Sequence, residues 1–231
     1  MRPLGLAFAA LASCVIAGQA SATPIPVANN SFESPTGLAC PTSWTCQPGA
    51  SSSDVGVYAP GAAQYNSNGT NGLPNGSRVP DGSQVLFIND FNGQGAQVVF
   101  QNVATIADQT TYSLDVWVGH RLDFGWEVPE LRLLANGSLL TTSGSLADPG
   151  VGKWADYSLS YTTIAGDSHS GQNLSVELYD NDPRVGQVNF DLVSLNASSR
   201  VVAVPEPSSL FLLVPGLFLL MMSAGRARKS S

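Results

Sequence analysis

Apolar and polar side chains alternate through the middle of the chain, and this period of two constrains the fold more than any other feature. In TYSLDVWVG, residues 111–119, the apolar side chains from Tyr112 to Val118 fall on one face of a strand, and Trp117 falls on the other. The pattern recurs between Gly-, Asn- and Pro-rich turns. We predict further strands at residues 83–89, 96–103, 131–135, 138–142, 155–162, 173–180 and 187–195.

Two of these segments are separated only by Asn136 and Gly137, the residue pair typical of a tight hairpin turn. No helix longer than a turn or two is visible between residues 23 and 203. Many short strands with such turns predict an all-β fold, a jelly-roll β-sandwich. The segment is long enough for one domain with its own core.

The chain is acidic, with 17 Asp and Glu residues against 10 Lys and Arg, and a net charge of −7. Four of the basic residues lie near the two ends, so the segment between them is more acidic still. This charge argues against nucleic acid or an anionic membrane surface as a partner.

The first 22 residues have the pattern of an export signal. Arg2 supplies a positive charge, residues 4–18 are apolar, and Ala20-Ser21-Ala22 forms a small-residue cleavage site. The mature protein is therefore expected to begin at Thr23. An alternative is that residues 11–14 form a lipoprotein box, in which Cys14 is acylated and becomes the new N-terminus.

The other end carries a second apolar segment, residues 210–224, followed by Arg226, Arg228 and Lys229. These fifteen residues span roughly 22 Å as a helix, so flanking residues are needed to cross a hydrocarbon core of about 30 Å. We predict a transmembrane helix over residues 209–225 with its basic end in the cytoplasm.

Pro205, Glu206 and Pro207 directly precede this helix. The order of Pro-Glu-Pro, apolar helix and terminal basic cluster over residues 204–231 resembles the PEP-CTERM sorting signal of Gram-negative bacteria. The resemblance implies recognition by the membrane protease exosortase. It also implies transient anchoring in the inner membrane, followed by delivery to the cell surface or the extracellular matrix.

The expected mature chain keeps two cysteines, Cys40 and Cys46, which enclose a five-residue loop. In an oxidising location this pair favours a local disulfide, and with no His nearby it makes a poor zinc site. Residues 40–80 are rich in Gly, Asn, Ser and Pro, and we expect a long irregular excursion pinned by the disulfide and by Tyr58 and Tyr65.

Two separated motifs, VANNSFESP at residues 27–35 and QVNFDLVSL at residues 187–195, resemble those of galactose-binding-like jelly rolls, the fold of many carbohydrate-binding modules. The resemblance implies that the first and last strands pair. It also makes Glu33 and Asp191 candidate ligands of a structural Ca²⁺, an ion that prefers oxygen ligands.

Few residues of the chain point to catalysis. His120 and His169 are its two histidines, and no nucleophile elbow or phosphate loop is present. His169 is interpreted as a loop-tip residue, and His120 as a polar residue at the junction of a strand and a loop. Glycosidase chemistry by two carboxylates stays open, because it needs merely two acids facing a cleft.

The segment HRLDFGWEVPE concentrates Arg121, Asp123 and Trp126, which are candidate glycan-binding residues because an aromatic ring can stack on a sugar face. We therefore expect a non-catalytic, exported β-sandwich that binds extracellular polysaccharide or has a structural role. The alternatives are a carbohydrate-active hydrolase and a purely structural biofilm or adhesion protein.

Overall fold

The structure, a computed structural model, describes residues 21–199, apart from residues 48–49, 51–52, 75, 90–95, 181 and 183. Nearly all of the predicted export signal, and the whole predicted sorting tail with its apolar segment, lie outside the described residues. The described part of the chain contains no apolar helix of membrane-spanning length.

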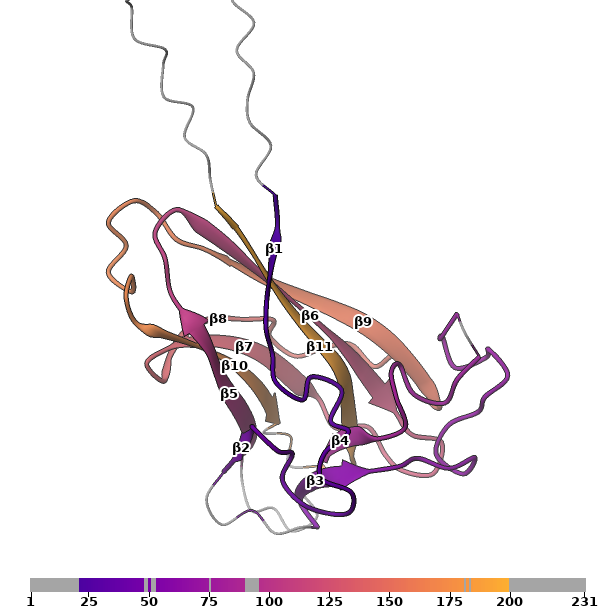
Figure 1. The fold of residues 1–231 in the computed structure, drawn as a ribbon. Helices are drawn as coiled ribbons and strands as arrows, with labels where there is room; N and C mark the ends of the chain where they lie inside the picture. Colours follow the sequence, from indigo (N-terminus) through magenta and orange to yellow (C-terminus); the bar gives the residue numbers. More distant parts are fainter. Residues whose placement is uncertain are drawn as a thin grey trace, which may run out of the picture. The chain divides into compact units, whose positions relative to one another are not determined.

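Strands make up the regular structure of the described residues (Figure 1). In chain order they are β1 (Thr23–Ile25), β2 (Thr45–Cys46), β3 (Val55–Tyr58), β4 (Val85–Ile88), β5 (Gln97–Thr105), β6 (Thr110–His120), β7 (Pro129–Ala135), β8 (Ser138–Thr142), β9 (Lys153–Thr162), β10 (Asn173–Asp180) and β11 (Val188–Ser199). Every strand predicted from the alternating pattern is present.

The strands form two antiparallel sheets. Sheet A has the order β3-β4-β11-β6-β9, with β1 also paired to β11, and sheet B has the order β2-β5-β10-β7-β8. From β4 onward the chain passes from one sheet to the other at every step except the β7–β8 hairpin, which is the winding of a jelly roll. The all-β sandwich is therefore confirmed, and the first and last strands pair as the resemblance implies.

The core lies between the sheets and is built from the inward-facing positions of the long strands. Its largest buried side chains include Phe32, Tyr112 and Phe190. Cys40 and Cys46 form the predicted disulfide, which closes a loop beside this core. Within that loop Trp44 is buried and its ring lies 5.3 Å from that of Phe32.

A second apolar cluster covers the outer face of sheet A. The segment of residues 59–84, here called the roof segment, contributes Tyr65, Leu73 and Val79, which pack with Val85 and Trp154. The backbone N–H of Trp154 donates to Asn71 (2.8 Å), and its indole N–H donates to the carbonyl of Arg78 (3.0 Å). The second half of the predicted irregular excursion is thus a packed cover on one sheet.

Candidate functional site

The most strongly perturbed carboxyl group beneath the roof segment belongs to Asp191. This β11 residue faces outward from sheet A and is 0% exposed. Its Oδ2 accepts the backbone N–H of Asp81 (2.9 Å), and its Oδ1 accepts the N–H of Leu192 (2.7 Å). Burial raises the pKa of Asp191 to about 8, because these two hydrogen bonds do not offset the loss of water around the charged form. This shift favours the protonated form of the carboxyl group near neutral pH.

Trp117 on β6 is the direct cross-strand partner of Asp191. Paired residues of this kind have Cβ atoms about 5 Å apart on the same face. Trp117 is half-buried and packs against the cluster of Tyr65 and Trp154, whose rings lie 4.8 Å apart. The buried carboxyl group of Asp191 thus lies beside Trp117, which adjoins this pair of aromatic rings.

Two tyrosines reach the same face from the roof side of sheet A. The hydroxyl groups of Tyr58 (3.0 Å) and Tyr65 (2.9 Å) both donate to Oδ1 of Asn189, two residues before Asp191 on β11. Burial raises the pKa of both tyrosines, so their hydroxyl groups stay protonated. The hydrogen bond from Tyr65 to Asn189 holds the first part of the roof segment against sheet A. The hydrogen bond from Asp81 to Asp191 holds it near its end.

A cavity of about 460 Å³ opens at the edge of the roof segment. It is lined by Glu33, Thr36, Gly37, Leu38, Val57, Tyr58, Ala59, Ser83 and Gln84. Its wall therefore includes Tyr58, whose hydroxyl group donates to Asn189, and Ser83 and Gln84, which lie shortly after Asp81 in the sequence. Asp191 and Trp117 are not part of its lining, so the cavity lies beside the buried carboxyl group and does not expose it.

Glu33 and Asp191, the predicted Ca²⁺ ligands, are both brought to residues 81–84. Glu33 is exposed, and its carboxylate accepts the backbone N–H groups of Ser83 (2.8 Å) and Gln84 (2.7 Å). Its negative charge contributes to the raised pKa of Asp191, after burial as the main cause. The described residues contain no group of three or more His, Cys, Asp or Glu side chains placed to hold a metal ion. Backbone carbonyls would have to complete any Ca²⁺ site.

Arg121 and Asp123, two of the predicted glycan-binding residues, form an ion pair of 2.8 Å with each other. Hydrogen bonds from Arg121 hold the pKa of Asp123 below its usual value. Arg121 also donates to Gln187 (2.6 Å) and lies over the ring of Tyr58. The pair therefore links the β6 end to the neighbouring loops.

The third predicted glycan-binding residue, Trp126, packs against the core, and its ring lies 5.5 Å from that of His120. The ring nitrogens of His120 contact Asp148 (2.8 Å) and the carbonyl of Phe124 (3.1 Å). Trp126 is therefore half-buried, with part of its ring against the core, and His120 is a buried residue that joins three segments.

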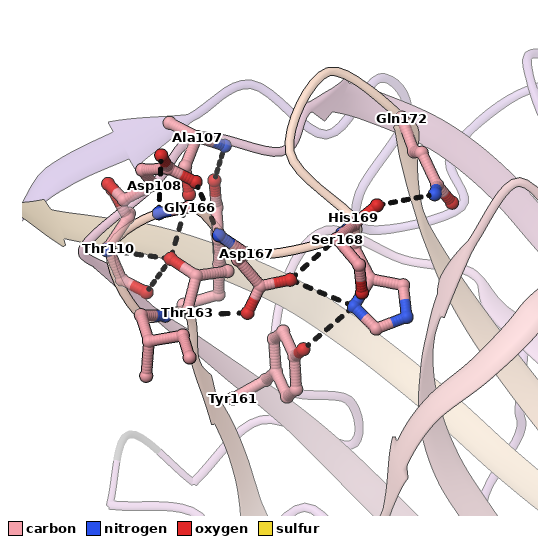
Figure 2. Close-up of polar contacts among 12 residues, drawn as sticks. Ala107, Asp108, Thr110, Tyr161, Thr163, Gly166, Asp167, Ser168, His169 and Gln172 are labelled. Carbon is pink, nitrogen blue, oxygen red and sulfur yellow. Dashed lines mark hydrogen bonds and ion pairs between the residues drawn. The ribbon is translucent and has the colours of Figure 1, made fainter.

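His169 lies in a turn near the β9–β10 connection, where Figure 2 shows it between Asp167 and Tyr161. Both neighbours contact the same ring nitrogen, Nδ1, at 2.9 Å for Asp167 and 3.3 Å for the hydroxyl group of Tyr161. A proton relay needs the two partners on different nitrogens. The backbone N–H groups of Gly166 and Asp167 bind Asp108, so the network serves to hold the turn.

Sequence reasoning singled out Asp191 but missed the residues around it. Trp117 carried a signal, because a large aromatic side chain on the polar face of an alternating strand indicates that something covers that face. Tyr65 was expected to pin the excursion, but nothing in the sequence linked it to Asn189. Their contact depends on how the roof segment folds.

Residues 23–196 match the protein family described as HpiC1-like: HpiC1 cyclase. The crystal structure of a cyclase from Fischerella sp. TAU is 20% identical, has a TM-score of 0.67, and covers 79% of this chain and 100% of its own. That of the Stig cyclase Fisc from the same organism, in complex with (3Z)-3-(1-methyl-2-pyrrolidinylidene)-3H-indole, has the same identity and TM-score and covers 78% and 100%.

A third structure, of a cyclase from Fischerella sp. TAU in complex with 4-(1H-indol-3-yl)butan-2-one, is 21% identical, with a TM-score of 0.63 and coverage of 78% and 100%. At these identities the likeness to the three structures shows a shared fold. No curated protein matches the sequence.

Proposed function

The chain belongs to the HpiC1-like cyclase family, and on this premise we propose that its β-sandwich domain closes a ring in a small aromatic substrate by acid catalysis, with Asp191 as the proton donor. The observation that carries the proposal is the fully buried carboxyl group of Asp191, with its pKa raised to about 8, beside Trp117. An acid that holds its proton at the working pH can donate it in the reaction.

Two predictions made from the sequence are thereby corrected. The family match is to a cyclase, so the expectation of a protein without enzymatic activity is wrong. The expectation of a carbohydrate-binding or structural role, with its hydrolase alternative, is wrong for the same reason. The sequence lacks the motifs of common hydrolases, and their absence favours a protein without enzymatic activity. Acid-catalysed cyclisation requires none of these motifs, however, so their absence does not exclude it.

Ring closure of this kind is an isomerisation. Asp191 gives its proton to an electron-rich carbon of the substrate, and a neighbouring π-bond attacks the resulting cation to form the new carbon–carbon bond. Loss of a proton from the substrate then restores its neutral form, and Asp191 regains a proton. No oxidant or reductant is required, and the ring of Trp117 would stabilise the cation.

We infer the substrate class from two observations. Trp117 pairs with Asp191 across the strands and adjoins the cluster of Tyr65 and Trp154, and two of the similar structures hold indole-bearing molecules. An indole-type substrate would stack against Trp117 once the roof segment moves. Such movement is needed because Asp191 is fully covered in the described conformation.

The test is turnover of a panel of indole derivatives that carry an alkene, followed by chromatography coupled to mass spectrometry. A cyclised product has the mass of its substrate and a different retention time. We expect Asp191→Asn to abolish this product and Asp156→Asn to retain it, since Asp156 also neighbours Trp117 but is exposed. Equal turnover by the two variants would remove Asp191 from the mechanism.

A structural Ca²⁺ bound by Glu33 and Asp191 remains a second proposal, supported by the position of both carboxylates at residues 81–84. It gives Asp191 a different role, because a carboxyl group must lose its proton to bind Ca²⁺. The ion would tie the roof segment to the start and the end of the domain.

We also propose that the enzyme is exported, sorted by an exosortase through residues 204–231, and delivered to the cell surface or extracellular matrix of a Gram-negative bacterium. The Cys40–Cys46 disulfide supports an oxidising location.

A further inference from the structure

Sheet B has a hollow on its outer face, on the side of the sandwich away from the roof segment. The hollow has a volume of about 530 Å³ and is lined by Val98, Phe100, Asn102, Leu134, Asn136, Gly137, Asn173, Ser175 and Glu177. Leu134 and Ser175 are only 8% and 4% exposed although they point away from the core. This volume is in the range of sites for small organic molecules.

The wall of the hollow is apolar around one carboxylate. Phe100 on β5 is the direct cross-strand partner of Glu177 on β10, and both are half-buried. Val98 and Leu134 extend the apolar surface, and Asn102, Asn136 and Asn173 form a polar rim. Glu177 is the one charged residue in this lining.

Arg132, on the other side of Glu177, is held outside the hollow. It contacts Oε1 of Glu177 at 3.3 Å, but it also pairs with Glu130 at 3.0 Å and lies over the ring of Tyr179. It lines a separate cavity further along the sheet. Burial raises the pKa of Glu177, and the shared guanidinium of Arg132 lowers it only in part.

We propose that this hollow is a second binding site, for a small aromatic amine. The ring of such a ligand packs on Phe100 and Leu134, and its ammonium group binds the carboxylate of Glu177. A carboxylate as the one lining charge, in a chain of net charge −7, favours a cation over an anion. The site is independent of Asp191, which lies on the other sheet.

The test uses three probes of nearly equal shape, phenethylamine, 2-phenylethanol and phenylacetate, titrated into the ¹⁵N-labelled protein. We expect phenethylamine to bind best and phenylacetate worst. The amide signals of Phe100 and Glu177 should shift, and those of Trp117 and Asp191 should stay.

Variants separate the charge from the apolar surface. Glu177→Gln should weaken phenethylamine binding about tenfold and leave 2-phenylethanol unchanged, because a charge-assisted contact is lost. Phe100→Ala should weaken the binding of both phenethylamine and 2-phenylethanol. If the alanine variant does not fold, Phe100→Leu is used in its place. Asp156→Asn, which removes an exposed carboxylate from the other sheet, is the matched control and should change neither.

Binding of phenethylamine that is insensitive to Glu177→Gln and Phe100→Ala would overturn the proposal, as would the absence of saturable binding. If phenethylamine binding is lost in Asp191→Asn and kept in Glu177→Gln, the amine binds under the roof segment, which would also contradict the proposal. Neither result bears on the cyclase reaction, which is tested by turnover.

Discussion

Tyr65 and Asn189 are joined by a hydrogen bond of 2.9 Å although 124 residues separate them in the sequence. The contact crosses the outer face of sheet A above Gly119, where a Cβ atom would lie 2.6 Å from the hydroxyl oxygen of Tyr65. The roof segment can therefore approach the sheet closely at this point. Asp191, two residues further along β11, is sealed from water beneath it.

Gly119→Ala should destabilise the protein. The added methyl group would meet Tyr65 and also the indole ring of Trp154 at 2.7 Å, so the roof segment must shift. Overpacking of this kind costs about 1–3 kcal/mol, measured as the free energy of unfolding in urea. Gly61→Ala is the control, since its nearest contact is 3.4 Å, and an equal loss in both variants would contradict the close packing.

The stability of the protein should fall between pH 4 and pH 8 partly because of Asp191. Its pKa is about 8 in the folded protein and about 3.9 when unfolded, so in this range the folded state keeps a proton that the unfolded state has lost. The contribution is fully present below pH 4 and decreases by at most about 1.4 kcal/mol per pH unit towards pH 8.

Urea unfolding at a series of pH values checks this, with Asp191→Asn as the comparison. The variant cannot titrate at this position, so its stability should depend less steeply on pH over the same range. Parallel pH dependences for the two proteins would show that Asp191 ionises normally.

Ca²⁺ should raise the melting temperature if Glu33 and Asp191 hold the ion. A ligand that binds only the folded state stabilises it by about 2.7 kcal/mol at a hundredfold excess over Kd, which corresponds to several degrees. Asp191→Ala should make melting insensitive to chelator. Equal melting of the native protein in EDTA and in millimolar Ca²⁺ would reject the site.

Replacing Cys40 and Cys46 together by Ser should leave the sandwich folded. The disulfide spans a sequence separation of 6, so it restricts only a short segment of the unfolded chain. We expect faster proteolysis within residues 40–80 and nearly unchanged circular dichroism. Global unfolding at 25 °C would show that the loop with Trp44 is essential to the core.

Deleting residues 210–231 should release the protein from the membrane fraction, because this apolar segment with its basic end is the predicted anchor. Cell fractionation and immunoblotting measure the outcome. Equal membrane retention would contradict the anchor and would favour acylation at Cys14.

The sequence by itself determined the strands and the sandwich. A period of two repeated over many short segments can bury one face of each only by stacking sheets, so the pattern of β6 around Tyr112 to Val118 predicts both the strand and its inward face. The short spacing of Cys40 and Cys46 likewise made their disulfide predictable, because nearby residues meet in almost any fold.

The surroundings of Asp191, and with them its pKa, depend on the tertiary structure alone. Its neighbour Trp117 comes from the pairing register of β6 with β11, and its cover comes from a Gly- and Asn-rich roof segment whose few apolar residues gave no periodic signal. A pKa depends on the water and charge around a group in three dimensions. The motif around Asp191 therefore suggested a ligand carboxylate, and only its burial under the roof segment shows that its pKa is raised.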